Sequence, residues 1–416
     1  MSVEHLQSLR CVLCGREQPV GGAWTCPHCG LEGILDVQLD LAQVRKTLTP
    51  QALGERPLSA WRYQELLPTR PGLEPPLQLG WTPVYEAPRL AQALGVTRAW
   101  VKDEGRNPTA SFKDRASAVG VVKALEAGAR AIACASTGNA ASSLAGFAAS
   151  VGLPSFIFIP ARTPEPKLAQ LLIYGATVFR VQGSYEDAYG LCQDACARHG
   201  WYNRNCAVNP YLIEGKKTAG LELAEQLGAQ LPDWVCMSVG DGCSIAGVWK
   251  GLVEMHALGF IPRLPRLLAV QSRGAAPLAR AFEQGTEPTP MEAAVTLADS
   301  IAVARPRNAR KALNAVRASK GIFVCVSDEE LLAAMRTLAR MSGVFAEPAA
   351  AAAAAGVVVA VREGKVRPSE SVVIVSTGSG LKDTQSAIRA GDAPVDLDPE
   401  AHALDEALAR QMEKVP

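Results

Sequence analysis

The sequence predicts an α/β protein built on open, twisted parallel sheets. Short runs of β-branched residues alternate with longer segments rich in alanine and leucine over most of the chain. This alternation is typical of parallel strands joined by crossover helices. The chain has 416 residues with a hydrophobic content of 48%, which is enough for two or three packed units. We therefore expect two α/β domains, preceded by a small cysteine-rich unit.

The individual elements follow from the position of each apolar run. Strands are predicted at residues 99–102, 131–135, 155–159, 177–181, 234–239, 266–270, 322–326 and 371–375. Helices are predicted between them, for example at 117–127, 140–151, 166–174 and 185–199. Residues 31–75 show little periodicity and are predicted to be a polar connection. The tail after Asp392 is acidic and polar, and is predicted to form a loose helix.

Composition excludes several classes of function. The net charge of +1 provides no basic surface for nucleic acid or anionic membranes. The longest uncharged apolar run, 349–361, is shorter than the ~18–20 residues of a membrane span. The start of the chain lacks the pattern of a signal peptide. Seven of the eleven cysteines are scattered through apolar surroundings, which fits a reducing compartment, so we expect a cytoplasmic protein.

The other four cysteines form two pairs near the N-terminus, and each pair has two intervening residues. A glycine follows each pair and permits a tight turn. Two such turns can close a tetrahedral site of four thiolates, which suits structural zinc. The alternative is a set of free thiols without metal. The predicted ligands are Cys11, Cys14, Cys26 and Cys29.

Lys113 is the first candidate for chemistry. It follows a polar segment of turn-forming residues, and an apolar helical pattern begins just after Arg115. The lysine therefore lies near a helix N-terminus, where backbone donors and the helix dipole favour an anion. A desolvated amine there can join an aldehyde as a Schiff base, which predicts a pyridoxal phosphate (PLP) anchor. The alternative is an ordinary solvated lysine at a helix start.

Three turns rich in glycine and hydroxyl residues supply the other parts of such a site. In the turn at 135–141, Ser136, Thr137 and Asn139 can surround a substrate carboxylate, and Asn139 can also donate to a ring oxygen. In the turn at 375–383, Thr377 can meet a pyridine nitrogen without protonating it. Each turn alone is equally well read as a plain turn or a capped helix start.

The third turn, at 239–247, predicts a phosphate site. It joins a strand to a helix, and its backbone amides can cradle a phosphate, although it is neither a Walker A loop nor a dinucleotide fingerprint. Asp241 lies inside this loop, so we expect its carboxylate to point away from the phosphate. The predicted ligands are Gly240, Asp241, Gly242, Cys243 and Ser244. One lysine and three turns at strand ends together predict one cofactor pocket.

These motifs, in this order, resemble the threonine synthase family within the PLP enzymes of the tryptophan-synthase-β fold class. The resemblance covers residues 9–390 and rests on NPTASFKDR, STGN, NPYLIEGKKT, SDEE, GVFAEPAAA and STGSGLKD. It implies a two-domain fold of PLP enzyme type II with an N-terminal zinc ribbon. It also implies that O-phosphohomoserine and water give threonine and phosphate.

The resemblance also implies a role for each site residue. Lys113 bonds the cofactor and then moves protons at the substrate carbons, while Asn139 binds the ring hydroxyl. Residues 240–244 hold the cofactor phosphate, and Thr377 binds the pyridine nitrogen. The substrate carboxylate lies among Ser136, Thr137, Asn139 and the backbone of Ala140.

Three segments depart from the family pattern. The family usually has glycine where Ala110 stands, and its phosphate loop usually reads GNxGN. The largest departure is at residues 159–167, where the family carries a Gly-Lys pattern that helps to hold the substrate phosphate. Arg162 and Lys167 are the cations that remain there, and we expect them to bind that phosphate. A related PLP ammonia-lyase, dehydratase or β-replacement enzyme with another leaving group remains the alternative.

The expected architecture has PLP between two domains. The boundaries are 1–35 for the zinc ribbon, 36–115 with 203–392 for the large PLP-binding domain, 116–202 for the small inserted domain, and 393–416 for the tail. The expected partner is a small amino-acid substrate, with no nucleic acid or membrane. The resemblance alone implies a homodimer.

Overall fold

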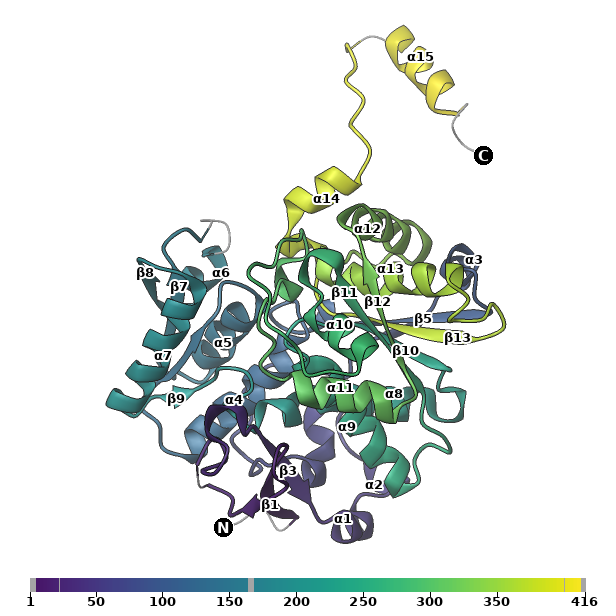
Figure 1. The fold of residues 1–416 in the computed structure, drawn as a ribbon. Coiled ribbons are helices and arrows are strands. Elements are labelled where there is room, and N and C mark those ends of the chain that lie inside the picture. Colours follow the sequence, from purple (N-terminus) through teal and green to yellow (C-terminus); the bar gives the residue numbers. More distant parts are fainter. Residues whose placement is uncertain (1–4, 22, 164–167, 400, 413–416) are drawn as a thin grey trace.

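The computed structural model describes residues 5–21, 23–163, 168–399 and 401–412. Three sheets organise this part of the chain, as Figure 1 shows. The two larger sheets lie side by side, and the smallest lies below them near the N-terminus. Helices cover both faces of the larger sheets, so the predicted α/β class is confirmed.

The largest sheet has six strands in the order β12-β11-β10-β13-β5-β4. All neighbouring strands run parallel except β4 and β5, which are antiparallel. The central strands β10 and β13 are buried at every position except Ser371, as parallel strands covered on both faces should be. The bounds are β4 Val84–Glu86, β5 Arg98–Asp103, β10 Trp234–Ser238, β11 Arg266–Ser272, β12 Ile322–Val326 and β13 Ser371–Ser376.

Two apolar cores lie on the two faces of this sheet. One core joins it to α3 (Pro88–Leu94), α12 (Asp328–Ser342) and α13 (Pro348–Arg362). The other joins it to α8 (Leu212–Leu227), α9 (Cys243–Leu258), α10 (Pro277–Gln284) and α11 (Ala309–Ala318). Strands therefore end at one edge between two helical layers, where the loops that follow them meet.

The second sheet has four parallel strands in the order β8-β7-β6-β9. Helices α4 and α5 pack on one face and α7 on the other. A capping box of Ser184 and Asp187 begins α7, and Gly200, with φ of +65°, ends it. The bounds are β6 Ile132–Ala135, β7 Ser155–Pro160, β8 Thr177–Val181, β9 Tyr202–Asn203, α4 Lys113–Glu126, α5 Asn139–Ser150, α6 Ala169–Ile173 and α7 Tyr185–His199.

The third sheet is antiparallel and carries the cysteine pairs. Its order is β2-β1-β3, with bounds Leu6–Cys11 for β1, Glu17–Gln18 for β2 and Leu35–Leu39 for β3. Its small core includes Val119 from α4 and Tyr211 from the segment before α8. The cysteine-rich unit therefore packs directly against the two helices that flank the candidate site.

The segment 31–75, predicted to be a polar connection with little periodicity, contains regular elements. This segment forms β3, the helices α1 (Leu41–Thr47) and α2 (Pro50–Gly54), and the 3₁₀ segments η1 (Gly30–Glu32) and η2 (Ala60–Leu66). Both α-helices are too short to show a helical period. They are defined by their N-caps, in which Asp40 accepts from Gln43 N at 3.0 Å and Thr49 from Ala52 N at 3.1 Å.

The eight predicted strands are all present, with ends shifted by two residues at most. Helix α4 begins four residues before its predicted start, so Lys113 is its first residue. The prediction of a helix at 166–174 lies partly outside the described residues, and α6 accounts for the rest. The remaining segments are η3 Glu104–Arg106, η5 Gly228–Gln230, η6 Arg273–Ala275, η7 Asp299–Ile301, η8 Gly380–Lys382, α14 Thr384–Ala390 and α15 Ala401–Met412.

The tail leaves the body of the molecule after α14, and α15 lies apart from it at the end of an extended segment (Figure 1). Among the described residues, no helix combines the length and apolar character that crossing a membrane requires. The boundaries of the two domains remain a prediction, and we propose that the inserted residues 116–202 carry most of the four-stranded sheet.

Candidate active site

Four loop segments that are far apart in the sequence line one pocket. They are the start of α4 after β5, the turn between β6 and α5, the turn between β10 and α9, and the turn after β13. All four follow the carboxyl ends of parallel strands, where open α/β sheets bind their ligands. The predicted residues that line this pocket are Lys113, Asn139, Gly240, Asp241, Gly242, Cys243, Ser244 and Thr377.

Lys113 is half-buried, and its amine makes no hydrogen bond or ion pair with another described residue. Burial lowers the pKa of this lysine, and the nearby charge of Lys216 lowers the pKa further. A lowered pKa increases the fraction of neutral amine, which is the nucleophilic form. The lysine segment is tied to the turn after β13 because Phe112 N donates to Thr377 O at 2.8 Å.

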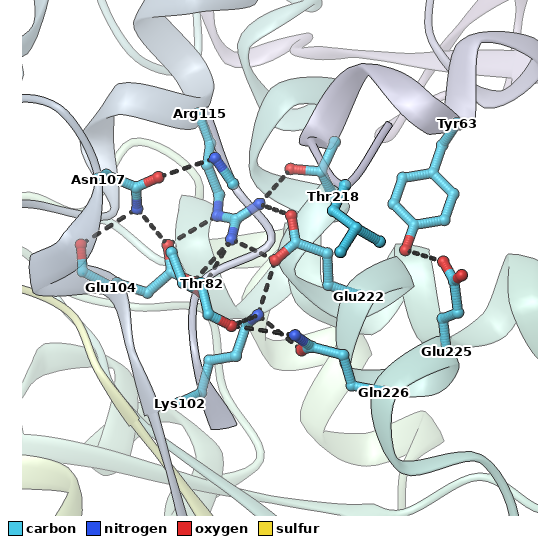
Figure 2. A network of polar contacts seen from close by, with 12 residues as sticks. Tyr63, Thr82, Lys102, Glu104, Asn107, Arg115, Thr218, Glu222, Glu225 and Gln226 are labelled. Carbon is cyan, nitrogen blue, oxygen red and sulfur yellow. Dashed lines mark hydrogen bonds and ion pairs between the residues drawn. The ribbon is translucent and has the colours of Figure 1, made fainter. Parts of the chain in front are cut away.

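A buried network of charges fixes the helix that carries Lys113 (Figure 2). The guanidinium of Arg115 is fully buried and pairs with Glu104 at 2.7 Å and Glu222 at 2.6 Å. Lys102 pairs with Glu222 at 2.6 Å, so two cations face two carboxylates and the network is neutral. Thr218 accepts from Arg115 Nη1 at 2.8 Å. The first turn of α4 is thereby bound to both β5 and α8.

The charges of this network change the pKa of Glu222. Burial alone would raise the pKa of Glu222, but the positive charges of Arg115 and Lys102 outweigh burial and lower it to about 2. The side-chain carboxylate of Asp114 fixes the loop before the lysine, since it accepts from Thr109 N at 2.6 Å. The position of Lys113 is therefore determined from both sides of the loop.

Ala110 stands where the family usually has glycine, and its backbone conformation accounts for that preference. Its φ is +64°, which lies in the left-handed region that glycine adopts without steric cost. A glycine at this position would relieve the strain of the alanine Cβ. The family preference for glycine here thus has a local backbone cause.

The turn at Ser136 opens α5 toward the pocket. Ser136 Oγ accepts from Gly138 N at 3.2 Å, and Asn139 is the first residue of the helix. Asn139 Nδ2 donates to Glu347 Oε1 at 2.8 Å and to Ser300 Oγ at 3.3 Å. Ser136, Thr137 and Ala140 remain partly exposed beside it. Among the described residues, the N–H groups of Asn139 and Ala140 have no acceptor and are free to bind an anion, whereas the next two N–H groups of α5 donate to Gly138 O.

The loop at 240–244 is shaped by two glycines. A Cβ on Gly240 would lie 3.1 Å from Ile301 Cα. Gly242 has φ of +88°, and a Cβ there would lie 2.6 Å from Ala312 Cβ. A side chain at position 242 would therefore require residues 300–312 to shift, and one at position 240 would crowd them.

The backbone N–H groups of this loop and the carboxylate of Asp241 differ in their hydrogen bonding. Among the described residues, no acceptor binds the backbone N–H groups of 240–243, which precede or begin α9. The carboxylate of Asp241 accepts from Arg307 N at 3.1 Å. This donor set, at the positive end of a 16-residue helix, suits the phosphate of pyridoxal phosphate.

Thr377 brings a hydroxyl to the opposite side of the pocket. Its side chain is nearly buried, and its backbone is fixed by Phe112. A Cβ on the next residue, Gly378, would lie 2.6 Å from Glu347 Oε1, so this turn packs tightly against the glutamate. The uncharged hydroxyl is chemically suited to a pyridine nitrogen that stays unprotonated.

Of the two cations predicted for a substrate phosphate, the structure describes only Arg162. Arg162 is exposed in the turn after β7 and does not line the pocket. Lys167 lies outside the described residues. The predicted pair of cations for a substrate phosphate is therefore untested by the structure.

Sequence reasoning missed four residues that line the pocket: Cys206, Lys216, Ser300 and Glu347. Burial raises the pKa of Glu347, although its hydrogen bond from Asn139 opposes the rise. Glu347 stands in the GVFAEPAAA motif directly before Pro348, the first residue of α13. A carboxylate at the end of an apolar motif is the signal that could have identified it.

The four N-terminal cysteines form a compact cluster. Their sulfur atoms all lie within 4.8 Å of one another, and Cys14 Sγ lies 3.7 Å from Cys26 Sγ. Tetrahedral zinc with Zn–S bonds of ~2.3 Å places its sulfur ligands about 3.8 Å apart. The glycines after the two pairs, Gly15 and Gly30, have positive φ of +70° and +60°, as the tight turns require. The donor set fits a structural zinc site.

Comparison with known proteins agrees with this geometry. Residues 76–378 match the family model described as pyridoxal-phosphate dependent enzyme. The chain is 39% identical to threonine synthase of Methanosarcina acetivorans, over 96% of this chain and 98% of that protein. It is 37% identical to threonine synthase of Methanocaldococcus jannaschii over the same shares.

Solved structures show the same fold in enzymes of other names. Diaminopropionate ammonia lyase of Escherichia coli superposes with a TM-score of 0.64 at 17% identity, over 93% of this chain and 97% of that chain. Maize serine racemase superposes with a TM-score of 0.63 at 22% identity, over 80% of this chain and 93% of that chain. These two likenesses concern the fold alone. The matched family model and the long alignments establish that the chain belongs to the pyridoxal-phosphate dependent enzymes and, within them, to the threonine synthase family.

Proposed function

We propose that the protein converts O-phosphohomoserine and water into threonine and inorganic phosphate. One observation carries the proposal: a chain that aligns with threonine synthases over 96% of its length brings Lys113 and the turns that contain Asn139, Gly240 and Thr377 around one pocket. Pyridoxal phosphate, when bound there, supplies an electron sink for negative charge at the substrate carbons.

Four segments of the chain hold the cofactor in this proposal. The neutral amine of Lys113 bonds the cofactor aldehyde, and the backbone N–H groups of 240–244 bind its phosphate. Asn139 Nδ2 donates to the ring hydroxyl, for which it must exchange its present partner Glu347. Thr377 Oγ1 binds the pyridine nitrogen.

Other groups bind the substrate and move its protons. Ser136, Thr137, Asn139 and the backbone of Ala140 surround the substrate carboxylate at the start of α5. Lys113 Nζ, when it is not bonded to the cofactor, would take a proton from Cα and serve as acid and base at Cβ in turn. Its lowered pKa supports this role because a larger fraction of the amine is then unprotonated and able to accept a proton. Arg162 and Lys167 are the candidates for the leaving phosphate that the sequence indicates.

Three further assignments belong to the proposal. Cys11, Cys14, Cys26 and Cys29 bind a structural zinc ion, as their mutual distances support. The protein acts in the reducing cytoplasm, as supported by eleven cysteines that are all free thiols. The active form is a homodimer, by family resemblance.

The test is a product assay with purified, PLP-loaded protein. The proposal expects phosphate and threonine in equal amounts from O-phosphohomoserine, and neither product from the Lys113→Ala variant. A parallel reaction with serine or threonine serves as the control for lyase chemistry. Ammonia and a keto acid from that control, with no phosphate from O-phosphohomoserine, would replace this proposal with the ammonia-lyase alternative.

A further inference from the structure

Two adjacent lysines on α8 are both fully buried but have different partners. Lys217 Nζ is neutralised by two carboxylates, Glu214 at 2.6 Å and Glu254 at 2.9 Å. Lys216 Nζ contacts only Cys206 Sγ, at 3.3 Å, and no carboxylate of the described residues lies within ion-pair distance of it. A buried ammonium without a counter-ion costs several kcal/mol. The folded protein thus keeps one buried cation whose natural partner is an anion.

Among the described residues, the groups around Lys216 provide it with no ion pair. Arg204 is also buried, and its guanidinium donates only to Ser117 Oγ, at 3.0 and 2.9 Å. The carboxylate of Asp241 is directed to the backbone of Arg307 rather than to the lysine. Lys113 lines the same pocket as Lys216, and so do the carboxylates of Asp241 and Glu347, of which Glu347 accepts from Asn139 Nδ2 at 2.8 Å. Lys216 is therefore available to pair with the negative charge of a ligand.

The thiol of Cys206 provides the partner of Lys216 in the protein alone. A hydrogen bond from Cys243 and the charges of Lys216 and Arg204 lower the pKa of Cys206 well below its usual value, against the effect of burial. Cys206 is partly exposed and lines the pocket. Its reactivity can therefore report whether Lys216 has another anion to bind.

The position of Lys216 shows which anion fits. Its Cβ lies against the start of α9, since a Cβ on Gly247 would approach it to 2.8 Å. It lines the same pocket as the free N–H groups of 240–243. An ammonium beside a helix N-terminus with unused backbone donors is the arrangement that binds phosphate dianions.

We propose that Lys216, rather than Arg162 or Lys167, is the principal cation of a phosphate-monoester site in this pocket. The inference rests on the proposed function, because both pyridoxal phosphate and O-phosphohomoserine carry such a group. When the phosphate binds, Lys216 exchanges the Cys206 thiolate for it, and Cys206 takes up a proton.

The first test uses the wild-type protein and the alkylation of Cys206 by iodoacetamide, located by peptide mass spectrometry. Inorganic phosphate should slow alkylation of the PLP-free protein, and pyridoxal phosphate should slow it more than pyridoxal does. Inorganic phosphate is then added to the PLP-loaded protein. A further decrease in the alkylation rate would indicate a second phosphate site, which would bind the phosphate of the substrate. Alkylation rates that none of these ligands changes would overturn the proposal.

The second test compares affinities in three variants. Lys216→Met removes the charge but keeps the length, Lys216→Arg keeps the charge, and Lys46→Met alters an exposed lysine on α1 as a control. The affinity for pyridoxal phosphate is measured by absorbance, and the affinity of the loaded protein for inorganic phosphate by calorimetry. Lys216→Met should weaken one of these affinities by about tenfold to a hundredfold, with substantial recovery in Lys216→Arg and no change in Lys46→Met.

The variant results also separate the sources of the phosphate. Weaker pyridoxal phosphate binding assigns Lys216 to the cofactor, and weaker inorganic phosphate binding to the loaded protein assigns it to the substrate. Both affinities within twofold of wild type, or a loss in Arg162→Met instead, would overturn the proposal. These binding measurements need no turnover, so a failure of the proposed reaction would be seen separately, in the product assay.

Discussion

Replacing Arg115 with methionine should destabilise the protein far more than a typical substitution. The guanidinium makes two bonds to each of Glu104 and Glu222, at 2.6–2.8 Å, inside a fully buried network. In the variant, Glu222 keeps its ion pair with Lys102, and Glu104 is left without a cation partner among the described residues. Removing one partner of a buried ion pair costs about 3–5 kcal/mol. We expect the free energy of unfolding to fall by that amount.

Urea unfolding of the PLP-free protein, followed by circular dichroism at pH 7, measures this change. The matched control is Arg98→Met, because Arg98 pairs with Glu86 at 2.9 Å but both side chains are about half exposed. An exposed pair contributes about 0–1 kcal/mol. A loss in Arg115→Met no larger than in Arg98→Met would refute the conclusion that this network fixes the helix of Lys113.

Three further outcomes are expected. The pKa of Glu222 is lowered to about 2 in the folded protein, so the stability that its charge provides is complete above the unfolded pKa of 4.5 and is lost as the pH falls toward 2. The urea concentration at the midpoint of unfolding should therefore decline between pH 6 and pH 3 in the wild type. The decline should be smaller in Glu222→Gln. Ala110→Gly should raise the free energy of unfolding by about 1 kcal/mol because of the left-handed φ, and no gain would remove the assignment of strain. Cys14→Ser should reduce bound zinc, measured by atomic absorption, and lower the melting temperature, whereas Cys325→Ser should leave the zinc content unchanged.

Much of the fold could be predicted because several of its strands are largely or wholly buried. A strand such as β10, buried at every position, appears in the sequence as a continuous apolar run between turn residues. Short elements such as α1 and β3 could not be predicted in this way. Their stability comes from an N-cap at Asp40 and from pairing with β1, and neither produces a period in the sequence.

The candidate site likewise contains some residues that could be predicted from local sequence patterns and others that could not. The turns at Ser136, Gly240 and Thr377 were predicted because each joins the end of a strand to the next element. Glu347 and Lys216 were missed because their significance depends on contacts between segments distant in sequence, which no local pattern encodes. For Lys216 a signal was available: adjacent lysines in a helix that is apolar on most sides cannot both reach solvent.

Borohydride reduction of the PLP-loaded protein, followed by peptide mapping, tests most directly whether the four segments form one pocket around the proposed anchor. Reduction makes the link between cofactor and lysine permanent, and the pocket contains two lysines, Lys113 and Lys216. The lowered pKa of Lys113 predicts that the cofactor is found on the peptide containing Lys113. A cofactor found on Lys216, or on a lysine outside the pocket, would contradict the assignment of the anchor and of the site built around it.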